Sequence, residues 1–297
     1  MEATSHGLDQ NRLACIDFEI GVLTNITHDH LDYHRTWENY ALSKAKLFKK
    51  VRHSILNYDD RKSFRFLKNR AAGQITTYGI AAPAKINAKN FPLKLKIAGR
   101  HNLQNALAAA ATTQILGISR QKIVSTLNNF SSPKGRMEKI DLGQNFKVIV
   151  DFAHTPNGLN HVLTTLKSQN SGRLIAVFGA AGERDSTKRP LMGKVADKDA
   201  DVIILTAEDP RSEKVSDICD QIAQGIKAKT EGKNLFKIED RQKAIEFAIS
   251  LASQNDAVGL FGKGHEKSMC FGKKETPWNE FQVATQAVKR RLNAKAK

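Results

Sequence analysis

FKVIVDFAHTP (146–156) opens as an apolar run and ends in polar residues, and the same pattern returns in RLIAVFGAAG (173–182), ADVIILTAED (200–209) and NDAVGLFGKG (255–264). Apolar runs of this length, separated by segments long enough for helices, predict the buried strands of a doubly wound α/β domain. In such sheets, ligands bind outside the carboxyl ends of the strands. We therefore expect the polar residues after these runs to gather at one edge of a sheet.

The residues before this domain also alternate between strand and helix patterns. Strands are expected within 15–25, 53–57 and 74–80, and helices over 37–51, 99–118 and 121–129. THDHLDYH (27–34) is expected to form a polar loop. SSPKG (131–135) is a break of Ser, Pro and Gly, so we predict two domains, 1–132 and 133–297.

Composition argues against several classes of protein. The hydrophobic fraction is 40%, no apolar run approaches the roughly 18 residues of a membrane span, and the N-terminus is too polar for a signal peptide. The three cysteines form no CxxC pair and no disulfide framework, which favours a reducing cytoplasm. The net charge of +17 raises the question of nucleic acid. Because the basic residues are spread out and no nucleic-acid motif joins them, we favour a basic surface that attracts anionic substrates.

Polar residues near the N-terminus have the chemistry of a cation site. Glu2 and His30 supply a carboxylate and an imidazole, which are ligands for divalent cations. The residues alone leave a solvated loop open as an alternative, and no neighbouring cysteine supports zinc. Lys44, within KAKLFKK (44–50), would by composition lie on a solvated helix face.

A longer pattern surrounds these residues. MEATSHGLDQNR (1–12), TNITHDHLDYH (24–34) and a lysine fourteen residues after His30 together resemble the central ATPase domain of Mur ligases, most nearly the MurE type. The resemblance implies that Glu2 and His30 bind Mg²⁺ and that a carbamylated Lys44 supports a second Mg²⁺. A carbamate turns the cationic side chain into an anionic oxygen ligand, which Mg²⁺ prefers.

The resemblance also assigns residues to two substrates. The UDP-muramoyl dipeptide would contact three polar side chains of the first segment, Thr4, Gln10 and Arg12, with Thr4 where a serine is usual. GRHNLQNALAAA (99–110) resembles the family helix whose asparagines contact the adenine end of ATP, here Asn102 and Asn105. KGRMEKI (134–140) resembles the segment at the domain junction, which implies that Arg136 reaches the nucleotide.

The strand ends of the second domain carry further family motifs. DFAHTP (151–156) implies that Asp151 and His154 position the phosphates and the incoming amine, although a strand-end aspartate is as often a cap. GAAGERDSTKRPLMG (179–193) is Gly-rich and basic, which suits anion binding. There Arg184 would meet a carboxylate of the amino acid, with Lys188 and Arg189 as weaker candidates.

Two motifs are implied to select the amino acid. EDPRSE (208–213) resembles DNPR, whose arginine forks onto the distal carboxylate of meso-diaminopimelate, so Arg211 favours this substrate over lysine. Asp209 stands where asparagine is usual, which adds a negative charge. GKGHE (262–266) implies substrate contacts from Gly262 and Glu266, with Glu266 receiving the ammonium group.

The resemblance implies a partial Mur ligase central domain followed by a Rossmann-like C-terminal domain. Its activity would be the ATP-dependent addition of the third amino acid, a diamino acid, to UDP-N-acetylmuramoyl-L-alanyl-D-glutamate in peptidoglycan biosynthesis. ATP would convert the D-glutamate carboxylate to an acyl phosphate, which the incoming amine attacks. Mg²⁺ and the basic loops would stabilise the charge that develops. No membrane or nucleic-acid partner is expected.

The family's phosphate-binding loop, G-x-x-x-x-GK[ST], is not found in this sequence, nor is its N-terminal domain for the UDP moiety. We therefore expect an incomplete chain, inactive alone, that lacks an N-terminal segment or is completed by another chain. Two alternatives stay open. One is a folylpolyglutamate synthetase relative, which EDPRSE and GKGHE disfavour, and the other is a non-catalytic binding or regulatory protein.

Overall fold

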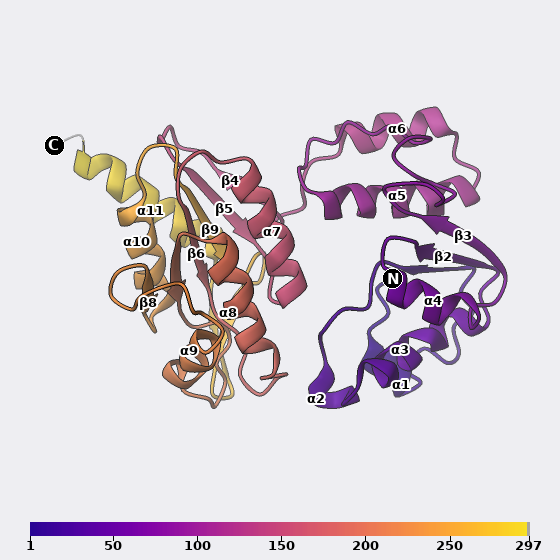
Figure 1. Cartoon of the computed structure of the whole chain (residues 1–297), viewed down its shortest axis with the longest axis horizontal. Coiled ribbons are helices and arrows are strands. Elements are labelled where there is room, and N and C mark those ends of the chain that lie inside the picture. The colour runs from indigo at the N-terminus through magenta and orange to yellow at the C-terminus, as the bar shows by residue number, and fades with distance from the viewer. Residues whose placement is uncertain (296–297) are drawn as a thin grey trace. The chain divides into compact units, whose positions relative to one another are not determined.

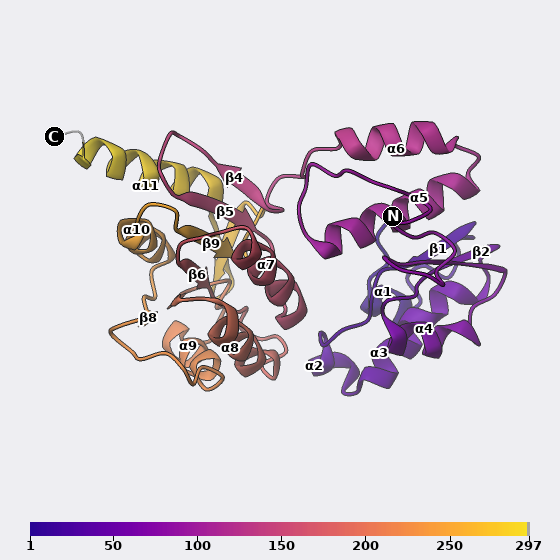
Figure 2. The same cartoon turned by 45° about the horizontal axis from the view of Figure 1, so that its top comes forward.

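The computed structural model describes residues 1–295, which divide into two compact units, Met1–Ser131 and Ser132–Lys297. The division lies within the SSPKG stretch. Each unit has a sheet of mainly parallel strands with helices packed against it (Figures 1 and 2). The predicted α/β class is therefore confirmed. Within the described residues, no helix is long and apolar enough to cross a membrane.

The first unit is built on a parallel sheet of order β1-β2-β3, formed by Ile20–Leu23, His53–Asn57 and Gln74–Tyr78. Neighbouring side chains of β2 point to opposite faces. Ile55 packs with α5 (Arg100–Ile115) and α6 (Arg120–Asn129), whereas Leu56 packs with α3 (Trp37–Ala45) and α4 (Arg61–Lys68). Figure 1 shows these two pairs of helices on either side of the sheet.

The polar loop predicted over 27–34 is wrong in its second half, because α2 (Leu31–His34) forms there. The His34 ring is buried, lies 3.0 Å from the Ser5 hydroxyl and stacks on Tyr40 at 5.3 Å. Ser5 begins α1 (Ser5–Asp9), a short helix that was not predicted. The helix predicted over 37–51 is α3 followed by the 3₁₀ turn η1 (Lys46–Lys49).

The second unit contains a sheet of order β4-β5-β9-β6-β7-β8, in which β4 alone is antiparallel among the described strands. In that order the strands are Glu138–Ile140, Lys147–Asp151, Ala257–Phe261, Leu174–Phe178, Val202–Leu205 and Leu235–Lys237. One face packs on α7 (Pro156–Ser168), α8 (Lys188–Asp199) and α9 (Val215–Ala223). The other packs on α10 (Arg241–Leu251) and α11 (Glu280–Lys295), which makes the domain doubly wound as predicted.

Strand β9 lies between β5 and β6, so segments distant in sequence meet at one edge. Asp151 at the end of β5 pairs with Phe261 at the end of β9. A hairpin of β10 (Ser268–Phe271) and β11 (Lys274–Pro277) follows β9. The carboxyl ends of the parallel strands thus bring the predicted DFAH, GERD, EDPR and GKGHE segments to the same edge.

A buried ion pair fixes two of these strand ends. The Arg241 guanidinium, on the first residue of α10, binds both carboxylate oxygens of Glu280 at 2.6 and 2.9 Å, and both side chains are 0% exposed. Its remaining donors bind the carbonyls of Ala207, just after β7, at 2.9 Å and of Phe261, at the end of β9, at 2.8 Å. The loops that leave β7 and β9 therefore start from a common anchor.

We predict that Arg241→Met lowers the free energy of unfolding by about 3–5 kcal/mol, because it leaves the Glu280 carboxylate buried and unpaired. Urea unfolding in a Trp37→Phe background, followed by Trp278 fluorescence, measures the effect, since the Trp278 indole donates to Glu280 at 2.7 Å. The control is Arg290→Met, which breaks a pair with Glu246 whose side chains are 63% and 36% exposed. That change should cost less than about 1 kcal/mol. Equal effects of the two substitutions would contradict the anchor.

Candidate functional site

Lys44 lies on α3 and points toward the start of the chain. Its ammonium donates to the Ala3 carbonyl at 3.2 Å. Burial lowers the pKa of Lys44, against the attraction of Glu2 and Asp29. A lowered pKa increases the fraction of neutral amine, which is the form that reacts with carbon dioxide. The solvated helix face that composition suggested is therefore not what the structure shows, because Lys44 is half-buried.

His30 is held by the residue beside it. It has a left-handed backbone (φ 57°), its amide donates to an Asp29 oxygen at 3.0 Å, and its imidazole lies 3.6 Å from the other oxygen. No group of three or more His, Cys, Asp or Glu side chains within residues 1–295 is placed to hold a metal. The Mg²⁺ roles of Glu2, His30 and Lys44 therefore remain predictions.

The residues predicted to bind the dipeptide substrate lie around α1. The Thr4 hydroxyl caps this helix by accepting from the Gly7 amide at 3.1 Å. Gln10 donates to the Tyr33 hydroxyl at 3.5 Å, and Arg12 is exposed. Thr4 therefore has a structural role that is sufficient to explain a hydroxyl there.

Asn102 and Asn105 lie one turn apart in the first half of α5, so both occupy one side of the helix. Asn102 donates to the Ala98 carbonyl at 2.7 Å, and Asn105 is exposed. The turn that precedes them needs Gly99, whose φ of 110° is unfavourable for other residues.

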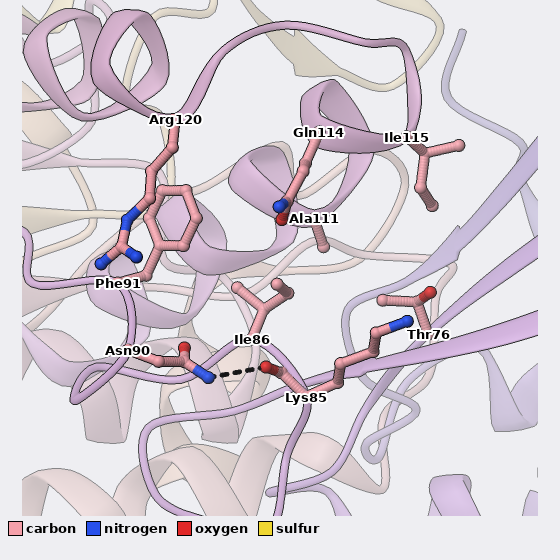
Figure 3. Close-up of a pocket in the computed structure, with 9 residues that line it drawn as sticks. All are labelled: Thr76, Lys85, Ile86, Asn90, Phe91, Ala111, Gln114, Ile115 and Arg120. Atoms are coloured by element: carbon pink, nitrogen blue, oxygen red, sulfur yellow. Dashed lines mark hydrogen bonds between the residues drawn. The ribbon is translucent and has the colours of Figure 1, made fainter.

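A pocket of about 430 Å³ lies elsewhere in the first unit, between the loop after β3 and the helices α5 and α6 (Figure 3). The Arg120 guanidinium lies 5.2 Å from the Phe91 ring, and Asn90 donates to the Lys85 carbonyl at 2.8 Å. Lys85, Asn90 and Arg120 are exposed. The pocket contains none of the predicted site residues, and we assign it no role.

Asp151 ends β5 and fastens the backbone around it. Its two carboxylate oxygens accept from the amides of Met137 and Ala153, both at 2.8 Å. Burial raises the pKa of Asp151, against these hydrogen bonds and the nearby Arg136 charge. The residue therefore joins the KGRME and DFAH segments, and its predicted catalytic role remains a prediction beside this structural one.

Phe152 was missed by the sequence analysis. Its ring contacts the Arg136 guanidinium at 4.6 Å, the His154 ring at 4.6 Å and the His265 ring at 5.3 Å. Gly135 allows this approach, since a Cβ there would lie 2.2 Å from the His265 amide nitrogen. An aromatic residue between Asp151 and His154 was the available signal. The structure thus gathers one arginine and two histidines around one ring.

A basic residue of the Gly-rich motif binds groups of the protein itself. Arg189 is 0% exposed and binds both oxygens of Glu213, at 2.6 and 2.9 Å. It also donates to the Ala181 carbonyl at 3.0 Å. Arg189 therefore has a structural role, and the weaker expectation that it binds a substrate anion remains a prediction beside this role. Arg184 is exposed, and Lys188 is buried.

The EDPR loop after β7 is tightly constrained. Glu208 is buried, and burial raises its pKa to about 7 against the attraction of Lys188, Arg241 and Lys263. Asp209 and Arg211 have left-handed backbones, with φ of 44° and 50°. The Asp209 carbonyl accepts from the Gly182 amide at 3.0 Å, and the Arg211 guanidinium donates to the Gly182 carbonyl. The loop thus rests on the segment that follows β6.

The GKGHE loop after β9 meets the EDPR loop through a lysine that was also missed. Gly262 (φ 108°) donates its amide to the Asp151 carbonyl at 3.1 Å. Lys263 is 1% exposed, and its ammonium lies 2.7 Å from oxygens of both Asp209 and Glu266. Burial alone would lower the pKa of Lys263, but these two hydrogen bonds raise it above its ordinary value. The sequence signal was a lysine within a motif read only for its glycine and glutamate.

Comparison with known proteins gives a consistent result. The model of the Mur ligase middle domain matches residues 1–113, and that of the Mur ligase, glutamate ligase domain matches residues 135–264. A UDP-N-acetylmuramoyl-L-alanyl-D-glutamate–2,6-diaminopimelate ligase of Caldanaerobacter subterraneus is 40% identical over 97% of this chain and 63% of its own length. A UDP-N-acetylmuramyl-tripeptide synthetase of Borreliella burgdorferi is 41% identical over 97% of this chain and 61% of its own length.

A solved UDP-N-acetylmuramoyl-L-alanyl-D-glutamate–2,6-diaminopimelate ligase superposes with a TM-score of 0.57 at 32% identity, over 98% of this chain and 64% of that one. The chain thus spans somewhat less than two thirds of the length of these relatives. Its two matched regions cover most of both compact units. On this evidence the chain belongs to the Mur ligase family, of which it carries a middle domain and a glutamate ligase domain.

Proposed function

We propose that this chain is part of an ATP-dependent ligase that joins a diamino acid, meso-diaminopimelate by preference, to UDP-N-acetylmuramoyl-L-alanyl-D-glutamate. The observation that carries the proposal is the meeting of two amino-acid motifs. Asp209 and Glu266 come from separate loops, yet both bind the same Lys263 ammonium at 2.7 Å. Arg211 lies two residues from Asp209. The connected loops therefore carry Arg211 as a cation for a substrate carboxylate and Glu266 as an anion for a substrate ammonium.

The reaction requires activation of a carboxylate and then attack by an amine. The D-glutamate side-chain carboxylate takes the γ-phosphoryl group of ATP, and ADP leaves. The substrate amine attacks the acyl carbon, loses a proton, and phosphate departs as the amide forms. Arg136 and His154, beside Phe152, have the charge and hydrogen-bonding capacity to hold phosphate groups at this edge of the sheet.

In the first unit, we propose that Glu2 and His30 bind one Mg²⁺ and that a carbamylated Lys44 supports a second Mg²⁺. When bound, Mg²⁺ would neutralise charge on the phosphates during transfer. The lowered pKa of Lys44 supports carbamylation, because it favours the neutral amine. Asn102 and Asn105 would contact the adenine end of ATP, and Thr4, Gln10 and Arg12 the UDP-muramoyl dipeptide. Arg184 would bind a carboxylate of the amino acid.

The relatives bear on the alternatives. Relatives at 36–41% identity are named as muramoyl-peptide ligases, and this does not favour the folylpolyglutamate alternative. Some are named for 2,6-diaminopimelate and two only as a tripeptide synthetase, so the choice of amino acid rests on Arg211. A cytoplasmic location remains our prediction from the free cysteines.

We predict phosphate release from ATP that depends on both UDP-N-acetylmuramoyl-L-alanyl-D-glutamate and meso-diaminopimelate. The assay compares the 297-residue chain with the full product of its gene, with L-lysine as the competing amino acid. A form that contains a phosphate-binding loop should be active, and a form without one should not. Absence of activity in both forms with either amino acid would instead support a non-catalytic binding role.

We predict that Arg211→Lys raises the KM for meso-diaminopimelate about 10- to 100-fold, because an ammonium cannot reproduce the two parallel bonds of a guanidinium to a carboxylate. Initial rates at varied amino acid concentration measure this, with the exposed Arg290→Lys as control. An unchanged KM would show that Arg211 does not bind the distal carboxylate.

A further inference from the structure

Lys263 connects the two loops that are implied to hold the amino acid through its charge. Its ammonium contacts Asp209 on the loop after β7 and Glu266 on the loop after β9, each at 2.7 Å. The lysine is 1% exposed, whereas the Asp209 and Glu266 side chains are 18% and 38% exposed. The cation therefore lies beneath the carboxylates, and they separate it from solvent.

One oxygen of the Asp209 carboxylate holds the two loops together. The oxygen that binds Lys263 also accepts from the Cys270 amide at 3.0 Å, in the hairpin that follows GKGHE. The Cys270 carbonyl accepts from the Arg211 amide at 3.1 Å, and the Gly272 amide donates to the Arg211 carbonyl at 2.7 Å. The position of the Arg211 backbone thus depends on contacts that Asp209, and through it Lys263, completes.

We propose that Lys263 is a positioning and specificity-determining residue of the amino acid site. It holds Glu266 by one oxygen, leaves the other for the substrate ammonium, and cancels the negative charge of Asp209. With Asp209 and Lys263 cancelling each other, the charges left for the substrate are those of Arg184, Arg211 and Glu266, which are two cations for two carboxylates and an anion for an ammonium. Without Lys263, two carboxylates would face the site and favour a cationic diamino acid such as L-lysine.

This inference rests on the proposed function, and its test separates the two. Lys263→Met should raise the KM for meso-diaminopimelate about 30-fold while kcat changes less than about 3-fold, because a buried charge pair is broken beside the site but not at the reacting atoms. The preference for meso-diaminopimelate over L-lysine should fall about 10-fold. Lys263→Met/Asp209→Asn, which removes both charges, should recover most of the KM and of the preference.

The same variants are measured on the full gene product, both in the ligation assay and by calorimetric binding of meso-diaminopimelate with the dipeptide substrate and a non-hydrolysable ATP analogue. Lys274→Met, an exposed lysine on the neighbouring hairpin, is the matched control and should behave as the unmodified protein. Thermal unfolding of each variant shows whether it is folded. If Lys263→Met does not fold, comparison of the double variant with Asp209→Asn tests the same charge balance.

Ligation with an unchanged KM and preference in Lys263→Met would overturn the inference and leave the proposed function standing. Failure of the double variant to improve on Lys263→Met would also overturn it, since charge balance would then be irrelevant. Binding of the amino acid without ligation, weakened by Lys263→Met, would support the inference and contradict the proposed function. A protein that binds no diamino acid would contradict both.

Discussion

A buried ion pair, Arg241 with Glu280, anchors two strand ends of the second unit. Both side chains are 0% exposed, and the arginine also donates hydrogen bonds to the carbonyls of Ala207 and Phe261. These carbonyls lie where β7 and β9 end and the EDPR and GKGHE loops begin. A charge pair sealed from water tolerates little displacement, because an unpaired buried charge costs several kcal/mol. Contacts within the protein therefore fix these strand ends without a substrate.

The loops beyond these ends are joined in the same manner, by charges beneath the surface. The buried Arg189 binds Glu213 and supports the loop after β6. The buried Lys263 binds Asp209 of the loop after β7 and Glu266 of the loop after β9. Arg184 and Glu266, by contrast, keep side-chain surface in contact with solvent. The basic and acidic residues at this edge thus divide into buried ones that set geometry and accessible ones suited to ligands. Asp209 belongs with the residues that set geometry, because the Lys263 ammonium balances its charge.

The strands and the family could be predicted from sequence because both depend on local patterns. Apolar runs identify β5, β6, β7 and β9, and motif letters such as EDPR identify the family. What the sequence could not reveal depends on contacts between distant residues. In the sequence, His34 belongs to a segment that is typical of a solvated loop. In the structure its ring contacts Ser5 and Tyr40, which are distant in sequence. The motif around Arg189 indicates anion binding, and only the structure shows its ion pair with Glu213. Likewise, the partner of Lys263 is Asp209, which follows a different strand. Short elements such as β4 and β8 are stabilised by the sheet rather than by their own composition.

We propose that buried charges position an amino acid site at the carboxyl edge of the second unit. The most direct measurement is a crystal structure of the protein with meso-diaminopimelate bound. We expect a carboxylate of the ligand on the Arg211 guanidinium, an ammonium on Glu266, and Lys263 still bound to Asp209. Binding of the amino acid away from Arg211 and Glu266, or a Lys263 side chain that leaves Asp209 to contact the ligand, would contradict it.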